Sequence, residues 1–171
     1  ESKSVKLKTE IQASREEQPV VEVPNLDESQ KAKTKEALVQ QKELSQHRYL
    51  QMLIKKMAES RGYKATIEEP IPDGQGRVDV ALERHGKRIA CEIGVTTTKQ
   101  WEVYNVQKCL SAGYEVVVAV PMDKAAVETM QQMVNSKLDA KLHKQVFVME
   151  ADALFQYLET EIAKEATTET R

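Results

Sequence analysis

The stretch that decides the fold is GRVDVALERHGKRIACEIGVTTTKQWE, residues 76–102. Two segments of alternating apolar residues meet there at His85-Gly86, a plausible two-residue hairpin turn because Gly, and less often His, accepts positive φ. If Arg84 faces Lys87 across this turn, the numbers of every opposed pair sum to the same value. That register predicts one wholly apolar face, formed by the pairs Val78/Ile93, Val80/Cys91 and Leu82/Ile89.

The other face of the predicted hairpin carries two acids, Asp79 and Glu92, directly across from one another and beside Ala81 and Ala90. Their Cβ atoms are expected to lie about 5 Å apart, where like charges repel. Either both acids point into solvent, or neighbouring arginines neutralise them, or they hold a divalent cation. Hard carboxylate oxygens suit Mg²⁺ or Mn²⁺, whereas zinc would need His or Cys beside them. The sequence therefore favours a magnesium or manganese site at Asp79 and Glu92.

The rest of the chain predicts helices and strands in a fixed order around this hairpin. A helix is expected to end before Gly62, because Leu50, Leu53 and Ile54 recur at helical spacing and Gly commonly stops a helix. The continuous apolar run of residues 114–120 is typical of a buried parallel strand. The expected elements are a helix over 28–61, strands over 63–69 and through the hairpin, a helix over 97–112, a strand over 114–120, a helix after Asp123, a strand over 145–149 and a helix over 151–164.

This order, α-β-β-β-α-β followed by α-β-α, predicts an α/β fold with a mixed central sheet and helices on both faces. We expect a flexible polar arm over residues 1–28, a helical lead-in over 29–46, the folded domain over 47–165 and a frayed tail over 166–171. The lead-in is interpreted as a solvated helix, because a coiled-coil seam needs more heptads than this segment contains.

Composition limits the function only weakly. The 171 residues carry 25 basic and 27 acidic side chains, so the net charge of −2 gives no overall electrostatic case for nucleic acid. Residues 47–120, however, hold 11 basic and 9 acidic side chains, a slight local excess of positive charge. Two unpaired cysteines and the lack of a secretory or membrane-spanning segment predict a cytoplasmic protein. Because the chain begins at Glu1, we expect a processed product or part of a longer protein.

The element order and the two acids together resemble the PD-(D/E)XK nuclease superfamily, which has the restriction-endonuclease-like fold. The resemblance covers residues 46–121 and extends more loosely to Lys164. It implies an αβββαβ core with a C-terminal α-β-α extension. It also implies that Asp79 is the metal-binding aspartate and that Glu92 is the acid of the (D/E)XK tripeptide. The lysine of that tripeptide falls at Gly94 and is absent.

The resemblance suggests two replacements for the absent lysine, whose role is to stabilise charge on the phosphate. Lys108 shares a helix face with Glu102 and Asn105, and a lysine moved to this helix is a known departure within the family. Arg77 lies across from Gly94 in the predicted hairpin. We prefer Lys108, because an arginine beside two acids is already engaged in neutralising them. Hydroxyls at the start of this helix either hold a phosphate or cap the helix, and they belong to Thr96, Thr97 and Thr98.

Two functions follow from these patterns. The first is a metal-dependent nuclease that cleaves a phosphodiester bond, with DNA as the expected substrate and Mg²⁺ or Mn²⁺ as the cofactor. The second is a nuclease-like module that has lost its chemistry and serves in nucleic-acid binding or protein assembly. We also expect an attached or associated ATPase or helicase, as in mobile-element proteins. A homodimer is one of the assembly states considered.

Overall fold

The computed structural model describes residues 28–74, 76–94 and 99–169. Residues 1–27 of the expected arm, Thr96 to Thr98 and the last two residues lie outside this range. The expected helices and strands are present within it. They are α1 (Glu28–Glu59), β1 (Lys64–Pro70), β2 (Arg77–Arg84), β3 (Lys87–Gly94), α2 (Lys99–Ser111), β4 (Val116–Pro121), α3 (Ala126–Lys137), β5 (Val146–Val148) and α4 (Ala151–Glu169). Two short 3-10 helices that the sequence did not predict are η1 (Pro72–Gly74) and η2 (Ala140–Leu142).

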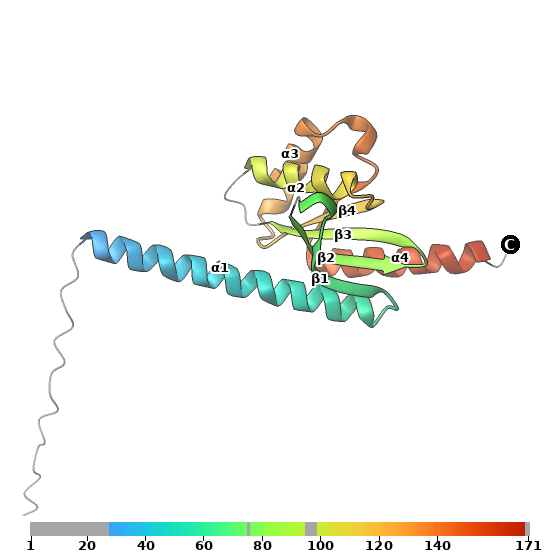
Figure 1. The fold of residues 1–171 in the computed structure, drawn as a ribbon, viewed down its shortest axis with the longest axis horizontal. Helices are drawn as coiled ribbons and strands as arrows, with labels where there is room; N and C mark the ends of the chain where they lie inside the picture. Colours follow the sequence, from blue (N-terminus) through green and yellow to red (C-terminus); the bar gives the residue numbers. More distant parts are fainter. Residues whose placement is uncertain (1–27, 75, 95–98, 170–171) are drawn as a thin grey trace, which may run out of the picture.

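The five strands form one mixed sheet in the order β1-β2-β3-β4-β5 (Figure 1). Strand β2 pairs antiparallel with both β1 and β3, whereas β4 pairs parallel with β3 and β5 pairs parallel with β4. Helix α2 supplies the crossover between the parallel strands β3 and β4, as parallel pairing requires. The predicted α/β class with a mixed sheet is therefore confirmed for the described residues.

Helices cover the sheet on both faces, and each face has its own apolar core. On one face, α1 and α4 pack against the sheet through side chains such as Ile54 and Leu158, which are fully buried. On the other face, α2 and α3 pack through Val106 and Val134. The strands between them alternate apolar side chains toward the two layers, which is why β4 is buried along its whole length.

The hairpin has the predicted register in its regular part. Arg84 pairs with Lys87, and the ladder runs back to the pair of Val80 and Cys91. His85 adopts a φ of 49° and Gly86 a φ of 81°, the left-handed conformation that a two-residue turn requires at both positions. The pairing ends at Val80 and Cys91, so the three expected pairs beyond it, which involve Asp79, Val78 and Arg77, are not part of the ladder.

The sheet changes its side-chain alternation at Glu68 and Asp79. Val80 faces the core of α1 and α4, but Val78, two residues earlier, faces the core of α2 and α3. Glu68, which the register of β1 and β2 places across from Asp79, has a φ of 54° and is skipped in the ladder. The prediction that the apolar face continues through Val78 is therefore wrong. A local irregularity in β1 and β2 places Val78 on the opposite face of the sheet from Val80. Such breaks re-aim side chains.

Helices α1 and α4 both extend beyond the region where they cover the sheet. The second half of α1 packs on the domain, while its first half projects past the end of the sheet (Figure 1). Helix α4 continues to Glu169 instead of ending at Lys164, and its Glu165 lies 3.3 Å from Arg84 and 3.7 Å from His85 of the hairpin. Within the described part of the chain, no helix has the length and apolar content to cross a membrane.

Candidate functional site

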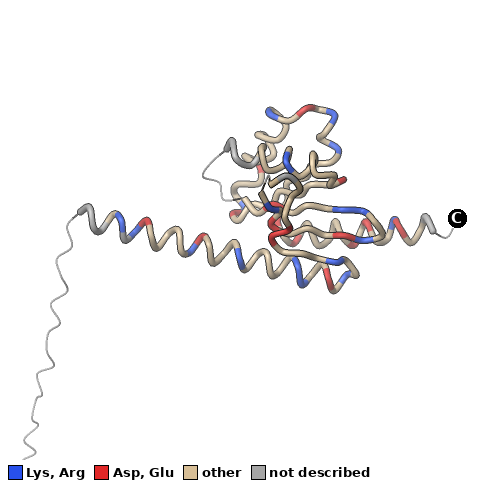
Figure 2. The backbone as a smooth tube through the Cα atoms, viewed as in Figure 1, with Lys and Arg blue, Asp and Glu red and all other residues tan. Residues whose placement is uncertain are grey.

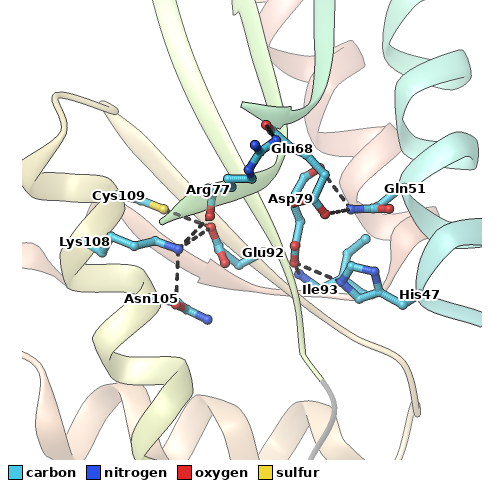
Figure 3. Close-up of polar contacts among 10 residues, drawn as sticks. All are labelled: His47, Gln51, Glu68, Arg77, Asp79, Glu92, Ile93, Asn105, Lys108 and Cys109. Carbon is cyan, nitrogen blue, oxygen red and sulfur yellow. Dashed lines mark hydrogen bonds and ion pairs between the residues drawn. The ribbon is translucent and has the colours of Figure 1, made fainter. Parts of the chain in front are cut away.

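The candidate site lies near the carboxyl end of β3, where Glu92 points toward α2 (Figure 3). Glu92 is only 7% exposed. Its Oε1 accepts a hydrogen bond from the thiol of Cys109 at 3.1 Å and lies 3.6 Å from the ammonium of Lys108. A carboxylate is thus held below the surface by two side chains of one helix.

Lys108 is also buried, with 7% of the residue exposed. Its Nζ donates to the backbone carbonyl of Arg77 at 2.7 Å and to Oδ1 of Asn105 at 3.2 Å, in addition to its ion pair with Glu92. An ammonium has three donors, so these three oxygens fix its position. The prediction that Asn105 and Lys108 share one side of the helix is confirmed by their contact.

Burial and a nearby charge change the acidity of Glu92. Removal from water raises the pKa of its carboxyl to about 7, and the charge of Asp79 acts in the same direction. Cys109 and Lys108 oppose this shift but do not cancel it. Near neutral pH, the carboxyl of Glu92 is therefore divided between its protonated and its charged form.

Asp79 has a different environment at the start of β2. Its Oδ2 accepts a hydrogen bond from the backbone N–H of Ile93 at 2.7 Å and lies 3.3 Å from Nε2 of His47 on α1. The hydrogen bond to Asp79 is the largest influence on the imidazole and raises the pKa of His47 above 6.5, although burial opposes it. The side chain of Asp79 is 19% exposed.

The sequence predicted that both acids point to the sheet face that carries Ala81 and Ala90. This prediction is wrong, because the two acids point in different directions. Glu92 points toward α2, whereas the carboxylate of Asp79 lies against the edge of β3 and toward α1 (Figure 3). The physical cause is the change of alternation in β2. Beyond the last backbone pair of β2 and β3, the side chain of Asp79 accepts a hydrogen bond from the backbone N–H of Ile93. The charge of Asp79 still reaches Glu92, as the raised pKa of Glu92 indicates.

Helix α1 supplies polar side chains that the sequence interpretation did not assign to the site. His47, which is 22% exposed, contacts Asp79. Gln51 donates from Nε2 to Oε1 of Glu68 at 2.6 Å and to the carbonyl of Asp79 at 3.4 Å. A signal was available, because His47 lies two turns and Gln51 one turn before the buried Ile54 on the same helical stripe.

The remaining predicted site residues are only partly brought together. Arg77 donates from its guanidinium to the carbonyl of Glu68 at 3.3 Å, so its side chain follows β1, while its own carbonyl accepts from Lys108. The side chain of Glu102, like the three threonines that precede α2, lies outside the described residues. Their proposed contacts with substrate stay predictions.

The side chains of the site that could act as metal ligands can be compared with the ligands that a divalent cation requires. Among the described residues, no three His, Cys, Asp or Glu side chains are grouped so that they could hold a metal ion. Mg²⁺, however, is usually bound through one or two carboxylates, with waters and substrate phosphates completing its shell. Asp79 and Glu92 offer two carboxylates from neighbouring strands, and they point toward α1 and α2 respectively.

The arrangement thus places two carboxylates, an imidazole and a buried ammonium around the end of a hairpin. Compared with known proteins, the chain matches no family model, no curated protein and no solved structure.

Proposed function

We propose that this protein is a metal-dependent nuclease of the restriction-endonuclease-like type, which cleaves a phosphodiester bond in nucleic acid, with DNA as the substrate. Asp79 and Glu92 hold Mg²⁺ or Mn²⁺, and Lys108 is the cation that serves the reacting phosphate. The proposal includes an associated ATPase or helicase portion and a role in the DNA processing of a mobile element.

The topology supports this proposal. A helix, an antiparallel set of three strands, a crossover helix and a strand parallel to the third follow one another, which is the αβββαβ order expected of that fold. The single strand after them, β5, corresponds with α3 and α4 to the α-β-α extension. The two acids lie on β2 and β3, and the chemistry would take place where these strands end.

The observation that carries the proposal is the position of Lys108. Gly94 lacks the side chain that the family motif places there, yet the ammonium of Lys108 reaches Glu92 from α2 and lies 3.6 Å from its Oε1. The ammonium is preorganised by its two other oxygen partners, so little reorganisation accompanies the reaction. A fixed cation in a partly dry site stabilises charge more strongly than the same cation in water.

The other residues of the site have separable roles. A bound Mg²⁺ or Mn²⁺ supplies Lewis acidity at the phosphate and lowers the pKa of water. Asp79 is oriented by the N–H of Ile93, and Glu92 is oriented by Cys109, so neither carboxylate needs to rearrange widely. His47 and Gln51 fix the other side of Asp79 and β1.

A second function is favoured by a specific observation. Oδ2 of Asp79 and Oε1 of Glu92 already have protein partners, so the cluster is electrostatically satisfied without a cation. A nuclease-like module used for nucleic-acid binding or protein assembly would need nothing more. The protonated form of Glu92 near pH 7 would then be a purely structural feature.

One experiment separates these functions. The protein is incubated with labelled single-stranded and duplex DNA in Mg²⁺, in Mn²⁺ and in a chelator, and cleavage is followed together with the melting temperature. A nuclease should cleave only with metal, and metal should raise the melting temperature by mass action. Both effects should be lost in Asp79→Asn, while Asp123→Asn, which changes an acid outside the site, serves as the matched control.

The two readouts have different meanings. Metal-dependent stabilisation without cleavage supports a metal-binding module instead of a nuclease. Neither cleavage nor stabilisation at millimolar metal would overturn the proposal and leave the module without a cofactor.

A further inference from the structure

Helix α1 carries two of its acids and two of its lysines on different sides. Glu36 and Glu43 lie about five and about three turns before the fully buried Ile54, so both acids share the side of the helix that packs on the sheet further along. Lys35 and Lys42 each precede one of these acids by one residue, which places each lysine about 100° around the helix from that acid. The lysines therefore belong to a different strip of the helix surface.

A line of positive charge runs along this strip, which we name the α1 basic face. It consists of four exposed residues that recur every seven positions, namely Lys35, Lys42, Tyr49 and Lys56. Seven residues are close to two helical turns, or about 10.5 Å, so the line is nearly straight and about 32 Å long. The face has three cations and no acid, and Glu59, three residues after Lys56, is already paired with Lys55.

The domain leaves the α1 basic face open. Every side chain described between residues 32 and 42 is exposed, and this half of α1 projects past the end of the sheet (Figures 1 and 2). Further along the helix, Tyr49 is 65% exposed, whereas Gln51 is only 5% exposed. Lys35, Lys42 and Lys56 form no ion pair with any residue that the structure describes. Their charges are therefore available to a partner.

We propose that the α1 basic face binds the phosphate backbone of duplex nucleic acid, independently of the base sequence. A row of ammonium groups without an acid among them is complementary to a polyanion, and each lysine that neutralises a phosphate releases bound counterions. The helix keeps this row straight, which suits a stiff duplex, whereas a flexible single strand is bound through several aromatic stacking platforms. Tyr49 is the single aromatic residue of the face.

An anionic membrane is a poorer partner for the same face. A helix that lies on a membrane buries an apolar face at the acyl boundary and keeps its lysines on the polar face. On α1 the apolar and basic residues share one side, because Leu38 lies four residues before Lys42 and Met52 lies four residues before Lys56. Insertion of the apolar side chains would therefore carry the lysines toward the lipid as well.

This inference rests on the proposed function in its choice of nucleic acid, and it gives that substrate a second point of contact. The face is separate from the candidate site, since none of its residues contacts Asp79 or Glu92 in the described interactions. Binding through lysines needs no metal. It can therefore be measured in a chelator, where the proposed metal-dependent cleavage does not take place.

Fluorescence anisotropy with a labelled duplex DNA measures this binding over a range of salt concentrations. A duplex of about 20 base pairs is longer than the face. The wild type should bind it with a dissociation constant of roughly 1 to 100 µM, and the logarithm of the binding constant should fall linearly with the logarithm of the salt concentration. A second duplex of unrelated sequence should bind equally well.

Lys42→Gln is the variant that tests the face. It should weaken binding about 3- to 10-fold at low salt and reduce the slope of the salt dependence by about 1, because one phosphate contact is lost. Lys42→Arg keeps the charge and should bind as the wild type does. Glutamine and arginine have helix propensities close to that of lysine, so α1 is preserved in these variants.

Lys33→Gln is the matched control. It removes the same charge from an exposed position of the same helix, but Lys33 lies nine residues from Lys42, or about two and a half turns, and so on the opposite side. Its binding should differ from that of the wild type by less than about 2-fold, because a charge outside the contact is screened by salt. Equal losses in Lys33→Gln and Lys42→Gln would show that no particular face of α1 is used.

Three further results would overturn the inference. The first is a wild type that does not bind duplex DNA at concentrations on the order of 100 µM and low salt. The second is tighter binding to a single strand of the same length than to the duplex. The third is binding to vesicles of anionic phospholipid that Lys42→Gln weakens while binding to the duplex is unchanged, which would assign the face to a membrane.

The outcomes are distinct from those of the cleavage experiment. Duplex binding that depends on Lys42, without cleavage in Mg²⁺ or Mn²⁺, supports this inference and overturns the nuclease. Metal-dependent cleavage, together with duplex binding that Lys42→Gln leaves unchanged, supports the nuclease and overturns this inference.

Discussion

The surroundings of Glu92 and of Asp79 differ although both acids come from one hairpin. Glu92 is held on the α2 side by a buried ammonium and a thiol, and burial raises the pKa of its carboxyl to about 7. Asp79 is held on the α1 side by a backbone N–H and by His47, and its side chain remains partly exposed. From the sequence the two acids were expected to have equivalent positions, but in the fold they differ in burial and in their hydrogen-bond partners.

If the two carboxylates hold a cation, this difference predicts different roles for them. Asp79 is oriented by a backbone donor and is partly open to solvent. Glu92 can gain or lose a proton near neutral pH, and binding of a cation would favour its charged form. Each of the following changes alters one side of this comparison.

The largest effect is expected from Lys108→Met, which removes the cation on the Glu92 side. If the protein cleaves nucleic acid, turnover should fall about 100-fold or more, because a fixed cation near the reacting phosphate is lost. Methionine is preferred to alanine because Lys108 is buried and its aliphatic stem occupies space beside Glu92. Cleavage rates with saturating Mn²⁺ provide the measurement.

Arg77→Ala is the comparison variant for this prediction. The guanidinium of Arg77 bonds to the carbonyl of Glu68, so its loss should reduce turnover less than the loss of Lys108. Wild-type turnover in Lys108→Met would remove Lys108 from the reaction. The reverse order of the two variants would transfer the role to Arg77.

The second largest effect is expected on the free energy of unfolding, which depends on pH because the carboxyl of Glu92 is buried. The carboxyl has a pKa of about 7 when folded and 4.5 ordinarily, so the unfolded chain releases its proton first as the pH rises. The free energy of unfolding should therefore fall between these two pH values and stay lower above them. Glu92→Gln removes this penalty and should raise the free energy of unfolding at pH 8 by roughly 1 to 3 kcal/mol without metal.

Denaturant unfolding at pH 5 and at pH 8, in a chelator, measures this effect. The gain from Glu92→Gln should be present at pH 8 and reduced to roughly a quarter at pH 5, where the unfolded carboxyl is already partly ionised. An equal effect at both pH values would show that the substitution acts through packing and not through ionisation.

The smallest effect is expected on the Asp79 side. The hydrogen bond to Asp79 raises the pKa of His47, so this contact contributes stability below the ordinary pKa of 6.5, which is lost as the pH rises through the folded pKa. Asp79→Asn should lower the pKa of His47, as followed by NMR titration of its ring protons. Asp123→Asn should leave the titration of His47 unchanged. An unaltered pKa in Asp79→Asn would mean that the contact does not persist in solution.

Local patterns in the sequence were sufficient for much of the fold. Alternation and the His85-Gly86 turn predicted the hairpin register, and apolar runs bounded by glycines predicted the order of helices and strands. These features depend on neighbouring residues, so periodicity reports them directly. The presence of acids on both hairpin strands was visible for the same reason, as was the shared helix face of Asn105 and Lys108.

The break at Glu68 and Asp79 was decided only by the tertiary structure. A hydrogen bond from a backbone N–H to a side chain at the end of a ladder leaves no periodic pattern in the sequence. One such irregularity places the following residues of the strand on the opposite face. The burial of Lys108 and the approach of His47 and Gln51 likewise depend on how α1 and α2 pack on the sheet. The sequence by itself identified the two acids, Asn105 and Lys108. Long-range packing determined their directions and the acidity of Glu92, because both depend on atoms far away in the chain.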